Sequence, residues 1–487
     1  MRHPPHDHPA PGRVISAGRF AYMLNCNYMQ ATRSNIQRSE EEEAIMDLVM
    51  DDPAALLAED PVQLTARDLA RIGITGLPEP LAKGLLKYLP DDFLVEEIAD
   101  GSYVSIDADD ELVQSGNSES GTFQFQVVKR GLETTEVAEM IADQLGIPLE
   151  SIGFAGMKDE QAITAQRMTA TGVSSAQLRT VTGKGFFIKS IAPAEGTLRP
   201  GLLQGNHFTI LIRSLPVDNF LLQNRLQKLA VAGFLNFYSV QRFGNRQNNH
   251  LVGRLILQQN YAEAAREVLI GDSPHERFFM REVRREAAKK WGNWRAMEES
   301  FLKFPQLFHI ELRALKAMQD GPELSRIFAI QPENTRFFIN AYMSYCFNRL
   351  LSRLSPEDPL LTADLPLLRR DPKVYPLYQN VMPNNELESL RFFHPQLSFL
   401  KFYRSIMVPP IVVPKIYGTA ETAAGSAFCF DLPKGAYATT FFSNIYSLYQ
   451  TQFEPEWLSS NFIDTPPLFG RQGEEFSPLR NFQFQAV

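Results

Sequence analysis

The chain has 487 residues, a formal net charge of −8 at pH 7 and a pI near 5.6. This acidic balance argues against a generally basic nucleic-acid-binding protein, although it is compatible with a local basic cleft. Hydrophobic residues make up 44% of the chain, which is enough for a sizeable core, and the length predicts two or three domains. The 35 phenylalanines suit either a packed core or surfaces on which bases stack.

The three cysteines, Cys26, Cys346 and Cys429, are scattered and form no CxxC or Cys/His cluster. Neither a zinc site nor a disulfide framework is therefore expected, and reduced, mostly buried thiols in a cytoplasmic protein fit better. No apolar run approaches the ~20 residues of a membrane span, and the N-terminal stretch lacks the apolar core of a signal peptide. We therefore expect no membrane association and no bound metal.

Residues 1–80 are predicted to form an N-terminal extension that is flexible over its first half. The capping box Ser39–Glu42 predicts a helix that stops near Pro53. A second helix is predicted from Thr65 to about Gly73.

From residue 81 onward, strand and helix patterns alternate, which predicts a mixed α+β core. The predicted strands cover residues 93–98, 121–128, 206–212 and 428–433, and the predicted helices cover 133–145 and 222–232. The second of these helices ends at Gly233, a typical C-terminal capping glycine.

Helical patterns dominate residues 245–415, and one of them is strongly basic. Seven Lys and Arg stand against two Glu between Arg277 and Arg295, in a stretch that also holds two Trp. Such a stretch is the clearest electrostatic footprint for a polyanion in this acidic chain. The candidate contacts are Arg284, Arg285, Lys289 and Lys290. A solvated amphipathic helix is the alternative interpretation.

Residues 153–170, GFAGMKDEQAITAQRMTA, place a carboxylate at Asp159 on a tight turn between two buried strands. The small residues that precede it allow another chain segment to come close. An ionised carboxylate in such a place is costly unless it is needed. Taken alone, a Lys158-Asp159 pair on a turn is more often structural.

This segment resembles the signature G-x-K-D-x-x-A-x-T-x-Q of the TruD family of RNA pseudouridine synthases, in which the aspartate is catalytic. The matching positions are Gly156, Lys158, Asp159, Ala162, Thr164 and Gln166. Further segments match in family order over roughly residues 84–445. The resemblance implies a catalytic domain with a mixed, largely antiparallel sheet flanked by helices, formed by residues 81–244 and 416–487. An inserted TRUD-type α/β domain at residues 245–415 would interrupt it.

Residues 84–97 resemble the family's strand in which a lysine precedes a P-x-D-F-x-V-x-E block. Lys87 falls at the position of the lysine that pairs with the catalytic aspartate. A cation there would keep Asp159 ionised and oriented. A surface lysine is the alternative.

Residues 236–244, NFYSVQRFG, are similar to the family's N-Y-F-G-x-Q-R-F-G, with Tyr and Ser in place of its Phe and Gly. Asn236 would orient the aspartate or the base, and Tyr238 would stack on a flipped base. Arg242 would contact a phosphate, or it would be a buried structural arginine.

Residues 430–439 resemble the family's F-x-L-P-x-G-S-[FY]-A-T, with Ala436 in place of the Ser. Tyr437 is the candidate for the second active-site aromatic, and a core aromatic is the alternative. Residues 340–348 resemble the S-A-x-x-S-x-x-F-N helix of the inserted domain, which we interpret as packing.

The resemblance implies isomerisation of uridine to pseudouridine in tRNA, usually at position thirteen. It implies no metal, nucleotide or redox cofactor. The partner would be tRNA or another RNA, and we expect a monomer. Asp159 would attack C1′ or abstract the 2′-proton, and the sequence leaves both schemes open. The target uridine must be flipped out to be reached.

Two rival functions are considered. A catalytically inactive paralogue would bind or remodel tRNA, but the intact Asp159 and Lys87 weigh against it. A retaining glycosidase with Asp159 as nucleophile would need a second carboxylate at a fixed distance, and no Asp or Glu stands out as that partner.

Overall fold

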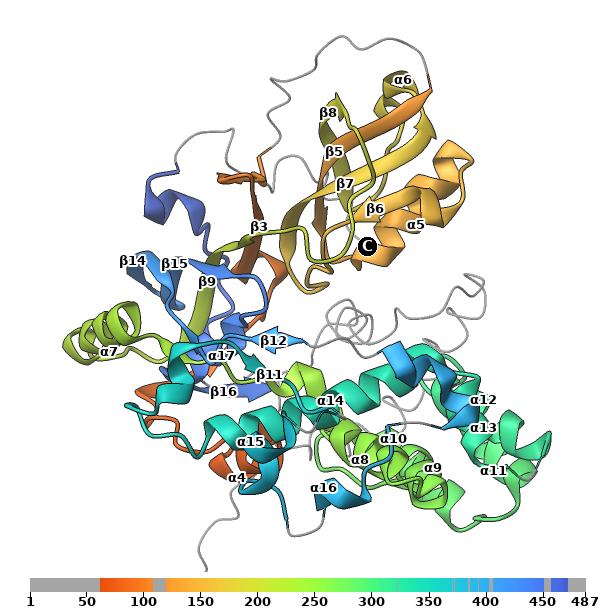
Figure 1. Ribbon diagram of the computed structural model, residues 1–487. Coiled ribbons are helices and arrows are strands. Elements are labelled where there is room, and N and C mark those ends of the chain that lie inside the picture. The colour runs from red at the N-terminus through yellow and green to blue at the C-terminus, as the bar shows by residue number, and fades with distance from the viewer. Residues whose placement is uncertain are drawn as a thin grey trace, which may run out of the picture.

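Figure 1 shows the computed structural model of the protein. It describes residues 62–107, 120–321, 323–369, 371, 373–383, 386–392, 394–402, 406–450 and 457–471. The predicted N-terminal tail, the capping box Ser39–Glu42 and Cys26 lie outside the described residues. The predicted helix after Thr65 is confirmed as α4 (Ala66–Arg71), where the Thr65 hydroxyl accepts a hydrogen bond from the backbone N–H of Asp68.

A twelve-stranded sheet forms the centre of the fold (Figure 1). Its strands are β1 (Val62–Gln63), β2 (Ala82–Leu85), β3 (Phe93–Ala99), β4 (Ser102–Tyr103), β5 (Gly121–Arg130), β6 (Ile152–Phe154), β7 (Ile163–Val173), β8 (Phe186–Pro193), β9 (Gly205–Ser214), β14 (Lys415–Thr422), β15 (Gly425–Pro433) and β16 (Tyr446–Gln450). The main path through the sheet runs β1-β16-β2-β9-β3-β7-β5-β8, and β15 also pairs with β9. The four predicted strands are confirmed as parts of β3, β5, β9 and β15.

The sheet is mixed, with mostly antiparallel pairings, as predicted. Val95 of β3 lies opposite Phe208 of antiparallel β9 and opposite Thr164 of parallel β7. Strand β2 runs antiparallel to β9 and parallel to β16. Strand β3, which follows the candidate lysine in the sequence, therefore lies beside β7, which follows the candidate aspartate.

Helices α5 (Thr134–Leu145), α6 (Ser175–Arg179), α7 (Asn219–Ala232) and α17 (Ala438–Ser443) accompany the sheet. Helices α5 and α7 confirm the two predicted helices. Gly233 ends α7 with a φ of 73°, and a Cβ there would lie 2.6 Å from the carbonyl oxygen of Val412. A glycine is therefore required at this helix end.

Residues 249–402, here called the helical segment, form the lower part of the molecule in Figure 1. Its α-helices are α8 (Asn249–Leu257), α9 (Tyr261–Ile270), α10 (Phe278–Ala288), α11 (Trp294–Phe301), α12 (His309–Gln319), α13 (Ser325–Ala329), α14 (Pro332–Leu351), α15 (Tyr375–Gln379) and α16 (Glu386–Ser389). The α/β character predicted for residues 245–415 is not seen: in the described part of that range, before β14 begins at Lys415, the strands are only the two-residue β11 (Leu365–Pro366), β12 (Met407–Val408) and β13 (Ile411–Val412). β13 pairs with β10 (Phe234–Leu235).

The remaining helical elements in the described residues are short 3-10 turns. They are η1 (Pro90–Asp92), η2 (Leu149–Ser151), η3 (Val240–Phe243), η4 (Pro359–Thr362), η5 (Pro395–Phe402) and η6 (Pro466–Phe469). Turn η1 directly precedes β3, and η3 precedes the helical segment, so each lies at a junction that carries candidate site residues.

The two faces of β9 pack against different parts of the molecule. Ile210 and Ile212 belong to an apolar cluster that extends into the helical segment. Leu211 belongs to a smaller cluster against which Ile463 and Phe469 pack. One face of the central sheet is thus covered by helices, and the other by the C-terminal end of the described chain.

The described part of the predicted N-terminal extension is packed into the fold. Strand β1 pairs with β16. The Asn348 side chain donates to the carbonyl oxygen of Ile72 at 3.0 Å, and the Ser352 hydroxyl donates to that of Gly73 at 2.8 Å. Residues 62–80 are therefore held by helix α14 and the last strand of the sheet.

Cys346 and Cys429 are buried free thiols, as predicted for both. None of the helices in the described ranges combines the length and the apolar character that a membrane-spanning helix needs.

Candidate active site

Asp159 lies in the loop of residues 155–162 between β6 and β7, so the two flanking strands are confirmed, but the connection is longer than the predicted tight turn. The backbone N–H of Lys158 donates to the Thr134 hydroxyl at 2.9 Å, and that hydroxyl donates to Gln166 Oε1 at 3.1 Å. The Gln166 amide then donates to the carbonyl oxygen of Gly156 at 3.1 Å. These bonds tie the loop to helix α5 and strand β7 at Gly156 and Lys158, both on the N-terminal side of Asp159.

Glycines in this region permit close approach of another chain segment. A Cβ at Gly153 would lie 2.5 Å from the carbonyl oxygen of Leu198 and 2.6 Å from the Thr169 hydroxyl. At Gly156 the nearest atom, Leu203 Cδ2, would be 3.4 Å away, which is an ordinary contact. The predicted close approach is therefore found at Gly153.

Lys87 forms a hydrogen-bonded ion pair with Asp159. The lysine side chain is 11% exposed and the aspartate side chain 33% exposed, so the pair is open to solvent on the aspartate side. Lys87 has a left-handed backbone, with φ of 59°, and its ammonium lies 4.4 Å from the centroid of the Phe93 ring. A non-glycine residue in this conformation is held there by its surroundings and is typical of functional sites.

The charges around Asp159 favour its ionised form. Burial alone would raise the pKa of the carboxyl group, and the charge and hydrogen bond of Lys87 act in the opposite direction. Lys129 and Lys158 lower the pKa further, so that it lies below its usual value. Asp159 is therefore a carboxylate at neutral pH and over a wide range below it.

Lys129 is a member of this site that sequence reasoning missed. It is fully buried on β5, where its ammonium donates to the carbonyl oxygens of Asp159 at 2.8 Å and Leu132 at 2.6 Å. Burial lowers the pKa of Lys129 to about 8, although Asp159 acts in the opposite direction. The signal was present in the sequence: Phe125 and Val127 face the core, and extending that alternation by one step places Lys129 on the buried face.

Tyr238, Arg242 and Tyr437 form a second group. The rings of Tyr238 and Tyr437 are 5.9 Å apart, the Arg242 guanidinium lies 5.2 Å from the Tyr238 ring, and Arg242 donates to the Tyr437 hydroxyl at 3.2 Å. Asn348 of α14 accepts from the backbone N–H of Tyr238 at 2.8 Å and donates to its carbonyl oxygen at 2.9 Å. Tyr238 is 8% exposed, and Tyr437 is half-buried.

The two groups border the same apolar core. Phe93, which lies against Lys87, belongs to the same cluster as Tyr238, with Tyr437 packed against that cluster. The hydrogen bonds and ion pairs described here connect Lys87 with Asp159, and Arg242 with Tyr437. They do not connect one group with the other.

Asn236 is buried between β10 and η3. Its side-chain amide donates to the carbonyl oxygen of Pro409 at 3.0 Å, and its backbone N–H donates to that of Pro410 at 2.8 Å. Its side-chain oxygen is buried and accepts no hydrogen bond. An unsatisfied buried acceptor is unusual and is explained when a ligand donates to it.

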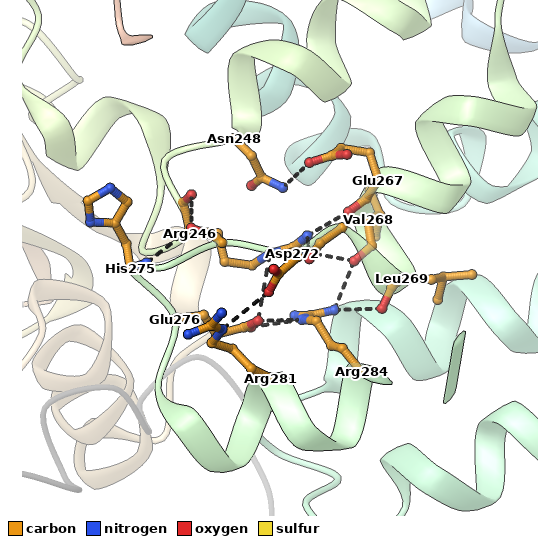
Figure 2. A network of polar contacts seen from close by, with 12 residues as sticks. Arg246, Asn248, Glu267, Val268, Leu269, Asp272, His275, Glu276, Arg281 and Arg284 are labelled. Carbon is orange, nitrogen blue, oxygen red and sulfur yellow. Dashed lines mark hydrogen bonds and ion pairs between the residues drawn. The ribbon is translucent and has the colours of Figure 1, made fainter. Parts of the chain in front are cut away.

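The structure encloses Arg284, which was predicted to contact RNA, inside the protein. Arg284 is 4% exposed, and Figure 2 shows its guanidinium within a network of polar contacts. It donates to both carboxylate oxygens of Glu276 at 2.8 Å, to Glu311 at 2.7 Å, and to the carbonyl oxygens of Val268 and Leu269 at 3.0 and 2.8 Å. The arginine joins α9, α10 and α12, and its donors point into the protein.

The other three basic candidates lie nearer the surface, and two of them pair with glutamates on the same helix. Arg285 is 52% exposed and pairs with Glu282, while Lys289 is 69% exposed and lies 2.5 Å from Glu286. Lys290 is half-buried and donates to the Ser300 hydroxyl. The net positive charge presented by α10 is thus smaller than the basic run in the sequence indicated.

Comparison with known proteins places this arrangement in a family. Residues 77–364 match the family model "tRNA pseudouridine synthase D (TruD)". A protein of Methanocaldococcus jannaschii named as a probable tRNA pseudouridine synthase D 1 is 32% identical over 281 residues, which cover 57% of this chain and 70% of that protein. The tRNA pseudouridine synthase D of Syntrophotalea carbinolica is 31% identical over 285 residues, which cover 58% of this chain and 67% of that protein.

The fold is also similar to that of a solved structure. A crystal structure assigned to tRNA pseudouridine synthase D (TruD) from Methanosarcina mazei matches with a TM-score of 0.55 at 20% identity. The match covers 78% of this chain and 98% of that chain. The family match over more than half of the sequence and the two similar sequences show that the chain belongs to the TruD family of tRNA pseudouridine synthases, which are isomerases.

Proposed function

We propose that this enzyme converts a uridine of tRNA, at position thirteen, into pseudouridine with Asp159 as the catalytic group. The observation that carries the proposal is the ion pair between Asp159 and Lys87, in a loop whose backbone is held at Gly156, at Lys158 and at the carbonyl oxygen of Asp159 itself. A lysine beside the carboxylate keeps it ionised and orients it, so that placement rather than activation is what the site supplies.

The reaction needs a carboxylate that can reach the ribose of a flipped-out nucleotide. Asp159 either attacks C1′ or removes the 2′-proton, and in both schemes the N-glycosidic bond breaks before the uracil rejoins C1′ through C5. The 33% exposure of the Asp159 side chain supports access from solvent. Its lowered pKa supports a carboxylate that is ready at neutral pH.

The second group supplies the surroundings of the base. Tyr437 is half-buried and is the more accessible of the two tyrosines, which suits it to stack on the extruded uracil. Tyr238 supports the Tyr437 ring from the core side. The unsatisfied oxygen of Asn236 is a candidate acceptor for the N3–H of the base. Arg242, which donates to the Tyr437 hydroxyl, orients that ring and is a candidate contact to a phosphate.

Asp159→Asn tests the proposal because it keeps the shape of the side chain and removes its charge. We expect no pseudouridine by mass spectrometry or carbodiimide labelling in a single-turnover assay on tRNA, with tRNA affinity nearly unchanged. Glu160→Gln is the matched control, since it removes the neighbouring carboxylate of the same loop and should leave turnover within a factor of ~2.

Mapping the labelled nucleotide in a tRNA transcript tests the position. Pseudouridine at position thirteen, lost when that uridine is replaced by cytidine, would support the proposed substrate. Formation at another position would overturn that part alone. Substantial turnover by Asp159→Asn would overturn the assignment of the catalytic group.

A further inference from the structure

Arg213 is a fully buried charge on the face of the sheet that the C-terminal end of the described chain covers. Its side chain is 0% exposed at the end of β9. Its Nε and Nη2 atoms donate to the two carboxylate oxygens of Asp92 at 2.7 and 2.8 Å, which is a bidentate pair. Burying a charge costs free energy unless the charge is fully paired, so a structural or functional role is expected for this pair.

Two of the side chains that Arg213 contacts, Asp92 and Tyr88, belong to one loop, residues 86–92, between β2 and β3. Asp92 accepts a further hydrogen bond from the backbone N–H of Leu89 at 3.0 Å. The Arg213 guanidinium lies 4.9 Å from the centroid of the Tyr88 ring. Tyr88 directly follows Lys87, so Arg213 contacts this loop at Tyr88 and at Asp92, on the C-terminal side of the lysine.

The strand before the loop is held by the same residue. Leu85, the last residue of β2, lies opposite Arg213 in the antiparallel pairing of β2 and β9. The remaining nitrogen, Nη1, donates to the carbonyl oxygens of Ser459 at 2.5 Å and Asn461 at 2.9 Å. Arg213 is therefore the point where the loop, strand β9 and the C-terminal end of the described chain meet.

We propose that Arg213 is a positioning residue for the isomerisation, because it holds the loop 86–92 in the conformation that brings Lys87 to Asp159. The left-handed backbone of Lys87 is unfavourable for a residue with a side chain and persists only where contacts on both sides hold it. The inference rests on the proposed roles of Lys87 and Asp159. It adds that the C-terminal end of the described chain fixes Arg213 through the carbonyl oxygens of Ser459 and Asn461.

The test compares Arg213→Met with Arg471→Met in the full chain. Arg471 is the matched control because it also makes a bidentate pair with an acid of the sheet, Glu96 of β3, at 2.7 and 2.9 Å. Its partner lies further along β3 and outside the loop. Both variants should lower the melting temperature. We expect only Arg213→Met to lower kcat, by ~10-fold or more, with the KM for tRNA within a factor of ~2.

A double variant shows whether Arg213 acts through Lys87. In Lys87→Met, adding Arg213→Met should cause no further loss of kcat, because the group that the arginine positions is already absent. Arg213→Lys, which keeps one hydrogen bond to Asp92, should recover part of the rate and also provides a soluble variant where Arg213→Met fails to fold.

The outcomes separate this inference from the proposed function. Equal loss of kcat in Arg213→Met and Arg471→Met would overturn the positioning role, as would effects of Arg213 and Lys87 variants that multiply in the double variant. Full activity of Lys87→Met would instead overturn the proposed role of Lys87. An inactive Lys87→Met together with a fully active Arg213→Met or Arg213→Lys would overturn only the inference about Arg213.

Discussion

The ammonium of Lys129 donates a hydrogen bond to the backbone carbonyl oxygen of Asp159 at 2.8 Å, from a strand that precedes the loop of Asp159 in the sequence. The same ammonium binds the carbonyl oxygen of Leu132 at 2.6 Å. One buried lysine thus links the end of β5 to the backbone of the candidate catalytic residue, while Lys87 binds its side chain.

Replacing Lys129 should impair catalysis without weakening tRNA binding. We expect Lys129→Met to lower kcat by ~10-fold, because the backbone of Asp159 loses a charged donor and the carboxylate loses precise placement. Lys189→Met is the control, since Lys189 is also a buried lysine, on the neighbouring strand β8, and donates to Asp107 instead. Comparable kcat values for the two variants would contradict a specific role for Lys129.

Lys87→Met should reduce the rate by ~100-fold or more, since an orienting charge beside a catalytic carboxylate is typically worth a few kcal/mol. It should also raise the pKa of Asp159, so that the acidic limb of the rate profile moves to higher pH. The measurement is kcat for pseudouridine formation between pH 4 and 7. A rate within a factor of ~2 of wild type would show that the ion pair is dispensable.

Tyr238→Ala should lower turnover more than Tyr238→Phe. The ring of Tyr238 contacts Tyr437 and Arg242, and its hydroxyl is used in none of those contacts. Loss of the ring would let Tyr437 move, whereas loss of the hydroxyl would not. Single-turnover rates for the two variants check this, and equal damage by both would assign a role to the hydroxyl.

Charge reversal of the two exposed basic residues of α10, Arg285 and Lys289, should weaken tRNA binding and flatten its salt dependence. Each phosphate contact that is lost lowers the slope of log K against log salt by roughly one unit. Lys228→Glu on α7 is the control, because α7 and α10 lie at opposite sides of the molecule in Figure 1. An unchanged slope would remove α10 from the RNA-binding surface.

Arg284→Glu should behave differently from those two variants. It would place a carboxylate beside Glu276 and Glu311 in the buried network of Figure 2. Because two buried acids would lose their partner, we expect a loss of several kcal/mol of stability, on the scale of ~3–5 kcal/mol for a broken buried pair. Thermal unfolding measures it, and a stable variant with weakened RNA binding would restore Arg284 as an RNA contact.

His207 should make stability depend on pH. Burial, the largest single cause, opposes its protonation, but the hydrogen bond to Asp431 together with the effects of Cys429 and Glu96 outweighs burial and raises the pKa to about 9. Because the folded pKa exceeds the ordinary histidine value of 6.5, this contribution to stability is complete below pH 6.5 and is lost as pH rises through about 9.

The variant Asp431→Asn tests the histidine contribution. It removes the carboxylate that accepts hydrogen bonds from His207 and from the hydroxyls of Tyr417 and Tyr103. We expect the fall in melting temperature between pH 6.5 and 9 to become smaller than in wild type. Parallel melting curves in the two proteins over that interval would contradict the assigned pair.

The sequence was sufficient for the parts of the site whose spacing is local. The turn that carries Asp159, the strand after Lys87 and the helix before Gly233 follow from patterns within a few residues. That Lys87 would meet Asp159 followed only from the family resemblance, since the two lie in loops before β3 and β7 and are joined by strand pairing.

Burial of charged residues was the part that local patterns did not reveal. In the sequence, Arg284 belongs to the same basic run as Lys289, yet one is enclosed by acids of neighbouring segments and the other is exposed. The acids that enclose it, Glu276 and Glu311, lie on separate segments, and only the packing of α9, α10 and α12 brings them to the arginine. Arg213 is a similar case, since its partner Asp92 is distant in sequence.

The pairing of β2 has a consequence for how the chain folds. Strand β2, which leads into Lys87, is flanked by β9 on one side and by β16 (Tyr446–Gln450) on the other. During synthesis, its second neighbour leaves the ribosome only after the whole helical segment has been made. Sheets that depend on such distant pairings fold slowly because a long loop must close first. A refolding chain should therefore gain activity only after β16 has docked. A chain that stops before residue 446 should lack β16, the strand that pairs with β2 just before Lys87.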